Sequence, residues 1–427
     1  MPGYVVVGAQ WGDEGKGKVV DVLSKQVDCI VRFQGGNNAG HTVVVNGEKH
    51  ILHLLPSGVL HEDSTCIIGP GVVVDPFVLL EEMAVLQSKG MSCDHIYVSD
   101  RAHLIMPYHI LIDTLEEERA GKNKIGTTKR GIGPCYADKY ARQGFRVHEL
   151  LDFEQFKHKL KIVLEKKNEL LTKLYQVEPL SYEKMVEQFA SILPEIKKRT
   201  MESVTYVNDA LEKQKLVLFE GAQAAMLDIN YGTYPYVTSS SPTSAGVCTG
   251  AGVAPSKIDR VIGVVKAYST RVGEGPFVSE LHDEIGEHIR QAGNEFGATT
   301  GRPRRCGWLD LNVIKHAVLL NGLTDIVITK VDVLSELDEI QVCTGYEIDG
   351  NIVHHIPSSL SDIEKAKPVY TTLAGWKQDI SNIREFNQLP ENCKRYIQLI
   401  EEVSGVRVSM VSVGPERNHN IYIHDLI

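Results

Sequence analysis

The sequence predicts an α/β protein with a large, mainly parallel central sheet flanked by helices. Short apolar runs at residues 4–7, 216–219 and 325–329 alternate with longer segments of helical periodicity along most of the 427 residues. A glycine-rich turn between the first apolar run and the first helical segment adds a P-loop-like nucleotide-binding core. No linker, low-complexity tract or fixed-period repeat divides the sequence, so we expect a single domain over residues 1–427.

The composition is that of a soluble globular protein, with 23% charged and 43% hydrophobic residues. The formal net charge of −10 argues against a nucleic-acid or anionic-membrane partner. Eight cysteines are scattered without a C-x-x-C pair, which favours reduced thiols over disulfides or a zinc site. The N-terminus does not resemble a signal peptide, and no run approaches the roughly 20 apolar residues of a membrane span. We therefore expect a cytoplasmic protein.

Strands and helices alternate from the start of the sequence. Residues 4–7 form a buried first strand because they are continuously apolar, and residues 19–23 have the spacing of a helix packed on it. Residues 29–33 follow as a strand. Asn46 and Gly47, between residues 43–45 and 49–55, predict a β-hairpin with a type I′ turn. Further strands are expected at 65–68 and 96–98, and helices at 76–86 and 110–120.

Two segments in the middle of the sequence depart from this alternation. Residues 121–146 are basic and punctuated by glycine, and we interpret them as a loop that is mobile without a ligand. Residues 150–213 are rich in Leu, Lys and Glu at helical spacing, which predicts a solvated helical insertion. The alternation then resumes, with strands expected at 216–219, 261–267 and 325–329, and helices at 280–291 and 309–320.

The turn after the first strand has the residue types of a phosphate-binding loop. Residues 12–18 match the spacing G-x-x-x-x-G-K, in which backbone N–H groups and lysines surround an anion. Val19 stands where a P-loop has the Ser or Thr that holds Mg²⁺, so another group must hold any metal ion, and Asp13 is the nearby candidate. A solvated glycine-rich turn is the alternative, and the density of glycine, lysine and acid disfavours it.

A second motif directly follows the apolar strand at 325–329. Residues 329–332, with Lys330 and Asp332, resemble the T/N-K-x-D element that reads guanine, because a carboxylate accepts from both N1–H and the exocyclic amine. Lys-x-Asp after a strand is common and is weak support alone. Together with the phosphate-binding turn it makes GTP the expected nucleotide. We therefore expect the P-loop-like core to bind GTP and to carry helical insertions.

Further polar groups suit a second anionic substrate. Residues 299–305 contain three arginines in four positions, which could bind a carboxylate or phosphate by bidentate contacts; an isolated run of this kind is more often a solvated turn. Thr128, Arg142, Thr238 and the Asn37-Asn38 turn supply more donors. His41, in a second glycine-rich turn, is a candidate general acid.

Residues 10–18, 131–142 and 299–308, in this order and with residues 329–332 behind them, resemble the signatures of the adenylosuccinate synthetase family in its bacterial form. The resemblance extends over essentially the whole chain. It implies GTP-dependent ligation of IMP and L-aspartate to adenylosuccinate, with GDP and phosphate, through a 6-phosphoryl-IMP intermediate. This reaction is the first committed step of AMP synthesis from IMP.

The resemblance also implies the roles of individual residues. The catalytic residues are Asp13, Lys16, His41 and Gln223. GTP is bound by Gly12, Asp13, Glu14, Gly15, Lys16, Gly17, Lys18, Gly40, His41, Thr42, Arg304, Lys330, Val331, Asp332, Ser412, Val413 and Gly414. IMP is bound by Asp13, Glu14, Gly15, Lys16, Asn38, Ala39, Gly40, His41, Thr128, Arg142, Gln223, Thr238 and Arg302. Aspartate is bound by Ala298, Thr299, Thr300, Gly301, Arg302, Pro303 and Arg304.

The same resemblance implies Mg²⁺ as cofactor, held by Asp13 and the Gly40 carbonyl. Arg142 is implied to reach the IMP site of a second subunit, which makes the protein a homodimer. Lys129 stands where glycine is expected, and this affects only how its loop moves. Two other functions are weighed against the ligase. A regulatory GTPase switch does not explain the second set of phosphate donors, and a GTP-using kinase would not need aspartate for turnover.

Overall fold

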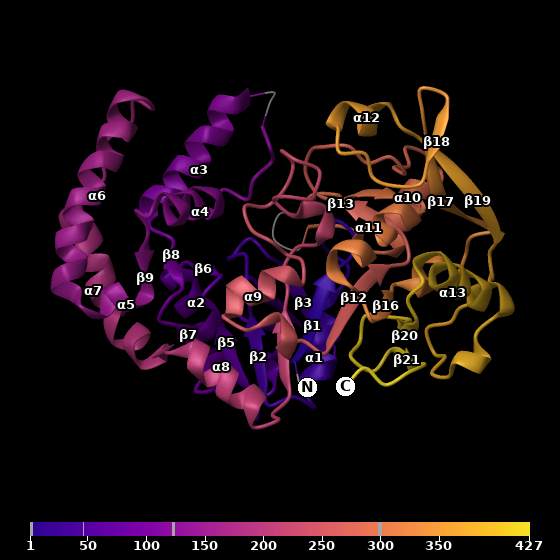
Figure 1. Ribbon diagram of the computed structural model, residues 1–427, viewed down its shortest axis with the longest axis horizontal. Helices are drawn as coiled ribbons and strands as arrows, with labels where there is room; N and C mark the ends of the chain where they lie inside the picture. The colour runs from indigo at the N-terminus through magenta and orange to yellow at the C-terminus, as the bar shows by residue number, and fades with distance from the viewer. Residues whose placement is uncertain (1–2, 46, 122–123, 298–300) are drawn as a thin grey trace.

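A ten-stranded sheet forms the centre of the protein. The structure is a computed structural model that describes residues 3–45, 47–121, 124–297 and 301–427. The strands lie in the order β10-β7-β5-β2-β11-β1-β12-β16-β20-β21, and Figure 1 shows helices on both sides of them. All neighbouring strands are parallel except β20 and β21. The predicted α/β fold with a mainly parallel sheet is confirmed.

The sheet strands have the following bounds: β1 (Gly3–Gly8), β2 (Cys29–Arg32), β5 (Thr65–Ile68), β7 (Ile96–Ser99), β10 (Thr200–Met201), β11 (Val217–Glu220), β12 (Arg260–Lys266), β16 (Asp325–Thr329), β20 (Val408–Ser412) and β21 (Asn420–Tyr422). Strand β1 shows why these runs are continuously apolar. Val5 and Val7 belong to the core on one face of the sheet and Val6 to the core on the other. Side chains alternate along a strand, so a strand covered on both faces has no polar positions.

The helices that pack around the sheet largely confirm the predicted ranges. They are α1 (Lys16–Ser24), α2 (Pro76–Ser88), α3 (Pro107–Ala120), α9 (Ala245–Ala251), α10 (Glu284–Ala292) and α11 (Leu311–Asn321). Helix α10 starts four residues later than predicted, because Asp283 caps it by accepting from the Gly286 N–H. Asp310 caps α11 in the same way, through the Asn312 N–H.

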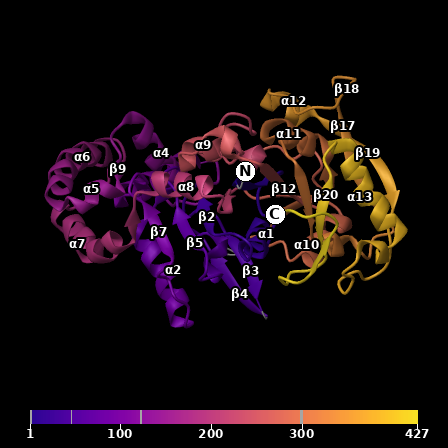
Figure 2. The same cartoon turned by 60° about the horizontal axis from the view of Figure 1, so that its bottom comes forward.

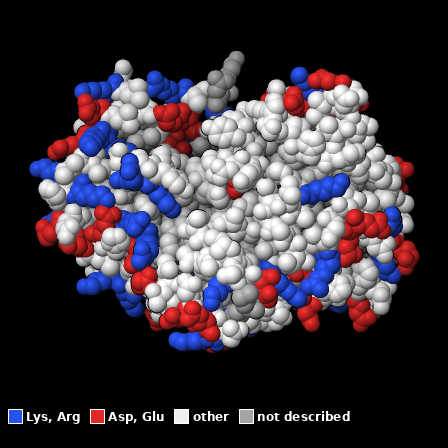
Figure 3. Space-filling view, in the orientation of Figure 1, with Lys and Arg blue, Asp and Glu red and all other residues white. Residues whose placement is uncertain are grey.

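The predicted helical insertion is also confirmed. Helices α5 (Val147–Leu151), α6 (Phe153–Lys173), α7 (Tyr182–Arg199) and α8 (Ser203–Glu212) occupy it, and Figure 1 shows α6 and α7 beside α3 and α4 as a lobe at one end of the sheet. Acidic and basic side chains intermingle on the visible surface of this lobe (Figure 3). That pattern fits a solvated helical layer.

The prediction of a loop over residues 121–146 is wrong for its second half. Helix α4 (Ile132–Ala141) and strand β9 (Phe145–Arg146) lie there. Ile132, Cys135 and Tyr136 form a small apolar cluster with residues beneath them, so tertiary packing holds a helix that the glycines and charges conceal. Gly131 begins α4 with a φ of 73°, a left-handed conformation that glycine adopts without strain.

The remaining strands form smaller sheets at the periphery. The predicted hairpin is confirmed as β3 (His41–Val45) and β4 (Glu48–Leu52), although Asn46 of its turn lies outside the described residues. One small sheet contains β6 (Val73–Val74), β8 (His103–Leu104) and β9. Another contains β13 (Ser269–Arg271) and β14 (Arg305–Gly307).

A further small sheet and two helices complete the opposite end from α6 and α7. They are β15 (Leu309–Asp310), β17 (Glu339–Ile348), β18 (Asn351–Val353), β19 (Lys367–Ala374), α12 (Leu360–Lys365) and α13 (Glu391–Ser404), and Figures 1 and 2 show them together there. None of these elements is predicted from the sequence, in which only the motif after residue 329 gives a signal in this region. All eight cysteines are free. Within the described ranges, no helix has both the length and the apolar character needed to cross a bilayer.

Candidate active site

The predicted site residues gather at one edge of the central sheet. Strands β2, β11, β1, β12 and β16 are neighbours and parallel, so their carboxyl ends point the same way. The phosphate-binding turn follows β1, the second glycine-rich turn follows β2, and Gln223 follows β11. The carboxyl edge of an open α/β sheet is where such folds bind ligands.

The turn after β1 has the backbone of an anion-binding loop. Gly12 and Gly15 have φ values of 92° and 85°, and Asp13 between them has a φ of 58°. These left-handed residues turn successive N–H groups to one side, and α1 begins immediately afterwards with its positive end at the turn. Gly15 caps α1 with no side-chain hydrogen bond, so no side-chain cap occupies this helix end.

The charged side chains of this turn are partly committed to internal contacts. Glu14 is buried and accepts hydrogen bonds from the N–H groups of Gln10 (3.1 Å) and Gly12 (2.8 Å), and from Lys16 Nζ (2.7 Å). The Glu14 side chain therefore stabilises the turn from inside. Lys16 lines the adjoining cavity beside this carboxylate.

Lys18 does not face that cavity but connects the turn to the end of β20. Its Nζ donates to Ser412 Oγ (2.6 Å) and to the Gly414 carbonyl (2.8 Å). Burial lowers the pKa of Lys18 from 10.5 to about 7. The phosphate-binding turn and residues 412–414, predicted together from the resemblance to bind GTP, are thus joined by a direct contact.

A cavity of about 550 Å³ lies against the turn. Its lining residues from the predicted site are Gly12, Asp13, Gly15, Lys16, Gly17, Asn38, Ala39, Gly40, His41, Thr42, Thr128, Gln223 and Thr238. The structure therefore brings together nearly all residues predicted for IMP and the phosphates of GTP. Its size suits a nucleotide-sized ligand.

Three amides form a chain beside this cavity, and two of them, Gln223 and Asn38, line it. Gln34 Nε2 donates to Gln223 Oε1 (3.1 Å), and Gln223 Nε2 donates to Asn38 Oδ1 (3.2 Å). Because each amide fixes the next, the orientation of Gln223 and Asn38 is set before any ligand binds. Thr238 lines the same cavity, and its Oγ1 is buried without a hydrogen-bond partner among the described residues. A buried hydroxyl in this state is suited to bind a substrate group.

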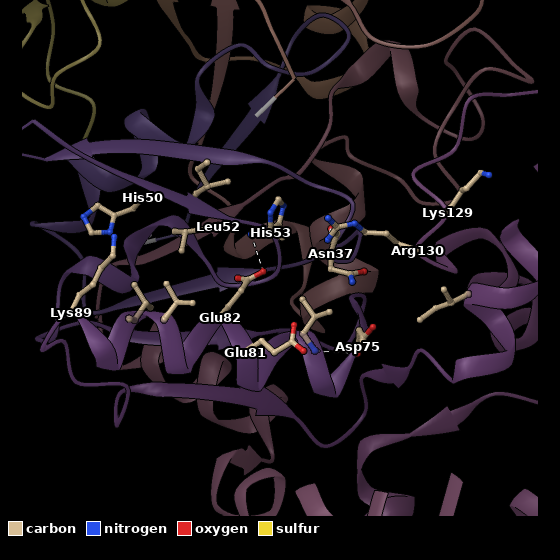
Figure 4. A pocket seen from close by; sticks show the side chains of 15 residues that line it. Asn37, His50, Leu52, His53, Asp75, Glu81, Glu82, Lys89, Lys129 and Arg130 are labelled. Atoms are coloured by element: carbon tan, nitrogen blue, oxygen red, sulfur yellow. Dashed lines mark hydrogen bonds between the residues drawn. The ribbon is translucent and has the colours of Figure 1, made fainter. Parts of the chain in front are cut away.

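Asn37, expected to act with Asn38, lies elsewhere. It lines a second cavity of about 510 Å³ between the β3–β4 hairpin and α2, with Asn37 and Arg130 at one end and His50 and Lys89 at the other (Figure 4). Two contacts from this side brace the turn after β2. His53 Nδ1 lies 2.7 Å from the Ala39 carbonyl oxygen, and Arg130 donates to the Asn37 carbonyl at 2.9 Å.

The guanine-reading motif lies beside the phosphate-binding turn. Thr329 Oγ1 donates to the Glu14 carbonyl at 2.6 Å, although 315 positions separate the two residues. Asp332 is half-buried, and its Oδ1 is buried without a partner in the described part of the chain. Burial raises the pKa of Asp332. An unpartnered carboxylate oxygen is the acceptor that guanine recognition requires.

Arg304 connects the phosphate-binding turn to a buried carboxylate. Its Nε lies 2.9 Å from Asp13 Oδ2, and its guanidinium donates to Glu295 Oε2 at 2.6 Å. Glu295 also binds Lys266 (2.9 Å) and Lys330 (3.1 Å). Burial alone would raise the pKa of Glu295, but the surrounding cations hold it well below its ordinary value. Glu295 therefore stays ionised and fixes Arg304 and Lys330.

The arginine segment is only partly described. Ala298, Thr299 and Thr300, predicted for aspartate, lie outside the described residues. Gly301, Arg302 and Pro303 are exposed, and the Gly297 N–H donates to the Arg302 carbonyl at 2.8 Å. These residues do not line the cavity.

The residues present suit a magnesium ion. Asp13 and Gly40 line the same cavity, and a carboxylate with a backbone carbonyl supplies the oxygen ligands that Mg²⁺ prefers. Over the described ranges, no group of three or more His, Cys, Asp or Glu side chains could hold a metal ion by itself. A donor set of two protein oxygens suits an ion whose other ligands are phosphate oxygens and water.

Arg142 does not line this cavity. It caps the C-terminal end of α4 with a φ of 62°, and its side chain is exposed. Lys129, where glycine is expected, also has a positive φ of 55°. This left-handed backbone explains why glycine is expected at position 129, since glycine adopts it without strain.

The site also contains residues that the sequence does not predict, among them Arg271, Glu295 and Glu220. Arg271 lines the cavity and donates to Thr233 Oγ1 (3.0 Å) and to the Pro276 carbonyl (2.6 Å), so it holds the cavity wall. Glu295 and Glu220 are buried carboxylates that fix predicted site residues. A buried charge without a local motif gives no signal in a single sequence, because burial is decided by distant segments.

Comparisons with known proteins show the family of this chain. A family model described as adenylosuccinate synthetase matches residues 5–421. Adenylosuccinate synthetase of Fusobacterium nucleatum is 58% identical over 426 residues, covering 100% of each chain. That of Halothermothrix orenii is 53% identical over 421 residues, covering 99% of this chain and 98% of its own.

Two solved structures have the same fold. The structure of fully ligated adenylosuccinate synthetase from Plasmodium falciparum matches with a TM-score of 0.94 and 42% identity, covering 99% of this chain and 100% of its own. Cyanophage S-2L succinoaminodeoxyadenylate synthetase, bound to dGMP and dATP, matches with a TM-score of 0.62, covering 98% and 95% of the two chains. At 19% identity this second likeness concerns the fold alone.

Proposed function

The chain belongs to the adenylosuccinate synthetase family, and from this premise we propose how its residues carry out the reaction. The enzyme joins IMP to L-aspartate at the expense of GTP and forms adenylosuccinate, a ligase reaction of AMP synthesis. The observation that carries the assignment of residues is the 2.6 Å hydrogen bond from Thr329 Oγ1 to the Glu14 carbonyl. It supports a single GTP site made of the guanine-reading motif and the phosphate-binding turn.

The chemistry requires that O6 of IMP be activated. A hydroxide-like oxygen leaves a purine ring poorly, whereas phosphate leaves well. Asp13 takes the N1 proton of IMP, and the resulting 6-oxyanion attacks the γ-phosphorus of GTP, from which GDP leaves. The aspartate amine then attacks C6 of the 6-phosphoryl-IMP intermediate, and phosphate departs. The net products are adenylosuccinate, GDP and phosphate.

Asp13, Lys16 and His41 share the phosphoryl-transfer step. All three line the cavity, which supports their closeness to the reacting groups. Lys16 offers positive charge to the transferred phosphoryl group, and His41 donates a hydrogen bond to its oxygen. Gln223 and Asn38, held in the amide chain, orient IMP together with Thr128 and Thr238. Asp13 must exchange its contact with Arg304 for the N1–H of IMP.

Asp13 and the Gly40 carbonyl would hold Mg²⁺. When bound, the ion neutralises phosphate charge and polarises the transferred group. This arrangement also accounts for Val19, because the ion does not need the hydroxyl that a P-loop places there.

Guanine is recognised by Asp332, with the Lys330 stem against the base. Residues 412–414, which Lys18 holds beside the turn, complete the binding site for the guanosine part of GTP. Residues 298–304 bind aspartate, and an arginine of this segment binds its carboxylate. Arg304 serves GTP.

The assembly we propose is a homodimer in which Arg142 completes the IMP site of the partner. Its exposed position at the end of α4, away from its own cavity, supports this role. We also propose that residues 1–427 form one domain, because the central sheet takes its strands from residues 3–422. A cytoplasmic location fits the eight free thiols.

The test is product formation with IMP, aspartate, GTP and Mg²⁺ together and with each omitted singly. We expect adenylosuccinate only from the complete mixture, and no product when ATP replaces GTP. Steady GTP hydrolysis without IMP or aspartate, and without adenylosuccinate, would contradict the proposal and indicate a GTPase switch. A phosphorylated product formed without aspartate would indicate a kinase.

A further inference from the structure

Glu220 is a charged group buried at the catalytic edge of the sheet. It ends β11, next to the first strand, and its side chain is fully buried. Ser57 supplies two hydrogen bonds to it: the backbone N–H donates to Glu220 Oε2 (2.8 Å) and the hydroxyl donates to Oε1 (2.6 Å). Burial favours the neutral acid, but His41 and Ser57 outweigh it and lower the pKa of Glu220. Glu220 is therefore an anion beneath the cavity.

His41 is the group that this anion faces. Its Nδ1 lies 2.5 Å from Glu220 Oε1 and 3.0 Å from Ser57 Oγ. The Ser57 hydroxyl donates its proton to Glu220, so Ser57 Oγ and Glu220 Oε1 can both act only as hydrogen-bond acceptors toward Nδ1. Nδ1 must then carry a proton and donate it.

The other ring nitrogen is left for the substrate. Nε2 lies on the far side of the imidazole ring from Nδ1, and His41 lines the cavity. Among the described residues, Nε2 has no hydrogen-bond partner. A carboxylate on one nitrogen of an imidazole fixes the tautomer and orientation of the ring.

We propose that Glu220 is the positioning residue of His41, holding the imidazole so that Nε2–H donates to an oxygen of the transferring phosphoryl group. The inference rests on the proposed role of His41. His41 contributes a hydrogen bond of fixed direction, and no proton has to leave the ring during the transfer. Ser57 holds Glu220 in place and does not touch the substrate.

The first test is Glu220→Gln, which keeps the shape of the side chain and removes its charge. We expect kcat to fall about 10- to 100-fold, as for other groups that orient a reacting residue, with KM for IMP and aspartate within about twofold. His41→Asn should lower kcat at least as much. The double variant should lose no more than His41→Asn alone, because the two residues act as one unit.

The matched control is Glu82→Gln. Glu82 is also a carboxylate that accepts backbone hydrogen bonds, from His53, Leu54 and Leu55, and it does not contact His41. We expect Glu82→Gln to lower thermal stability by an amount comparable to Glu220→Gln and to leave kcat within about twofold. A merely structural role for Glu220 predicts equal effects of the two substitutions on kcat.

A spectroscopic readout covers the case in which Glu220→Gln does not fold. In the wild-type protein labelled with ¹⁵N-histidine, we expect a downfield Nδ1 proton that is absent from His41→Asn. Its absence from the wild type would overturn the inference. So would an unchanged kcat in folded Glu220→Gln, or losses that multiply in the double variant. An unchanged kcat in His41→Asn would overturn the proposed role of His41 as well. This result therefore separates a failure of the proposed function from a failure of the inference about Glu220 alone.

Discussion

Replacing Asp332 with asparagine should change which nucleotide the enzyme uses. The Asp332 Oδ1 atom is buried without a partner, so a base that supplies an N–H donor there relieves an unfavourable burial. Guanine supplies two donors, on N1 and on its exocyclic amine. Asparagine presents an NH₂ group to one of these donors, and the contact becomes repulsive. Xanthine has a carbonyl at that position and can accept from the same NH₂.

The size of the change follows from the hydrogen bond that is lost. A hydrogen bond to a charged group contributes about 1.5–3 kcal/mol, which corresponds to about 10- to 100-fold in the KM for GTP. A similar gain for xanthosine triphosphate makes the ratio of the two kcat/KM values change on the order of 10³-fold. The assay is adenylosuccinate formation with each triphosphate, for wild type and Asp332→Asn.

The pH dependence gives a second measure of the same contact. The proposed contact with guanine requires the ionised carboxylate, and burial raises the pKa of Asp332. The KM for GTP of the wild type should therefore increase as the pH falls through that raised pKa, and Asp332→Asn should lack this increase. Asp379→Asn is the matched control, since Asp379 is an exposed neighbour that adds negative charge near Asp332. An unchanged preference for GTP in Asp332→Asn would refute the assigned role.

Three further predictions concern the catalytic base, the subunit interface and the buried ion cluster. Asp13→Ala should abolish turnover while its thermal unfolding temperature stays close to that of the wild type; substantial remaining activity would remove Asp13 as the base. Arg142→Leu should raise the KM for IMP, and mixing it with inactive Asp13→Ala should restore activity through hybrid dimers; no recovery would count against a shared site. Glu295→Gln should lower the free energy of unfolding by about 3–5 kcal/mol at pH 7, because it leaves buried cations unpaired. Since the pKa of Glu295 is depressed below 4.5, this difference should shrink as the pH falls below 4.5, measured by urea unfolding; a difference constant with pH would contradict it.

Local patterns were sufficient for seven of the ten strands of the central sheet and for the motifs, whereas β10, β20 and β21 were not predicted. The apolar runs of β1 and β16 predict strands because both faces of the sheet are covered, and the glycines after β1 announce the turn directly. The same patterns fail for β19, whose residues are all half-buried or exposed, so no apolar run marks it. Helix α4 is missed for a related reason, since its apolar cluster is completed by Val73 and Ile105 from distant segments.

The carboxylates that organise the site could not be predicted for a different reason. Glu220 ends a strand and Glu295 follows a helix, and neither position distinguishes a buried anion from an exposed one. Their burial depends on Ser57 and on Lys266, which reach them only through the pairing of non-consecutive strands. A single sequence contains these residues but not their proximity.

In the GTP site that we propose, the order of strands in the sheet makes recognition of the base and binding of the phosphates one unit. Strand β1 supplies the phosphate-binding turn, and β16 supplies the guanine-reading motif two positions away. The Thr329 contact with Glu14 and the Lys18 contacts with Ser412 and Gly414 fasten the two together. A base that leaves the Asp332 carboxylate unpartnered does not relieve its unfavourable burial. Because the segment of Asp332 is fastened to the phosphate-binding turn, we expect such a base also to disturb the placement of the phosphates. Discrimination against adenine should on this basis appear in the placement of the γ-phosphate as well as in affinity, so that poor nucleotides lower kcat and raise KM together.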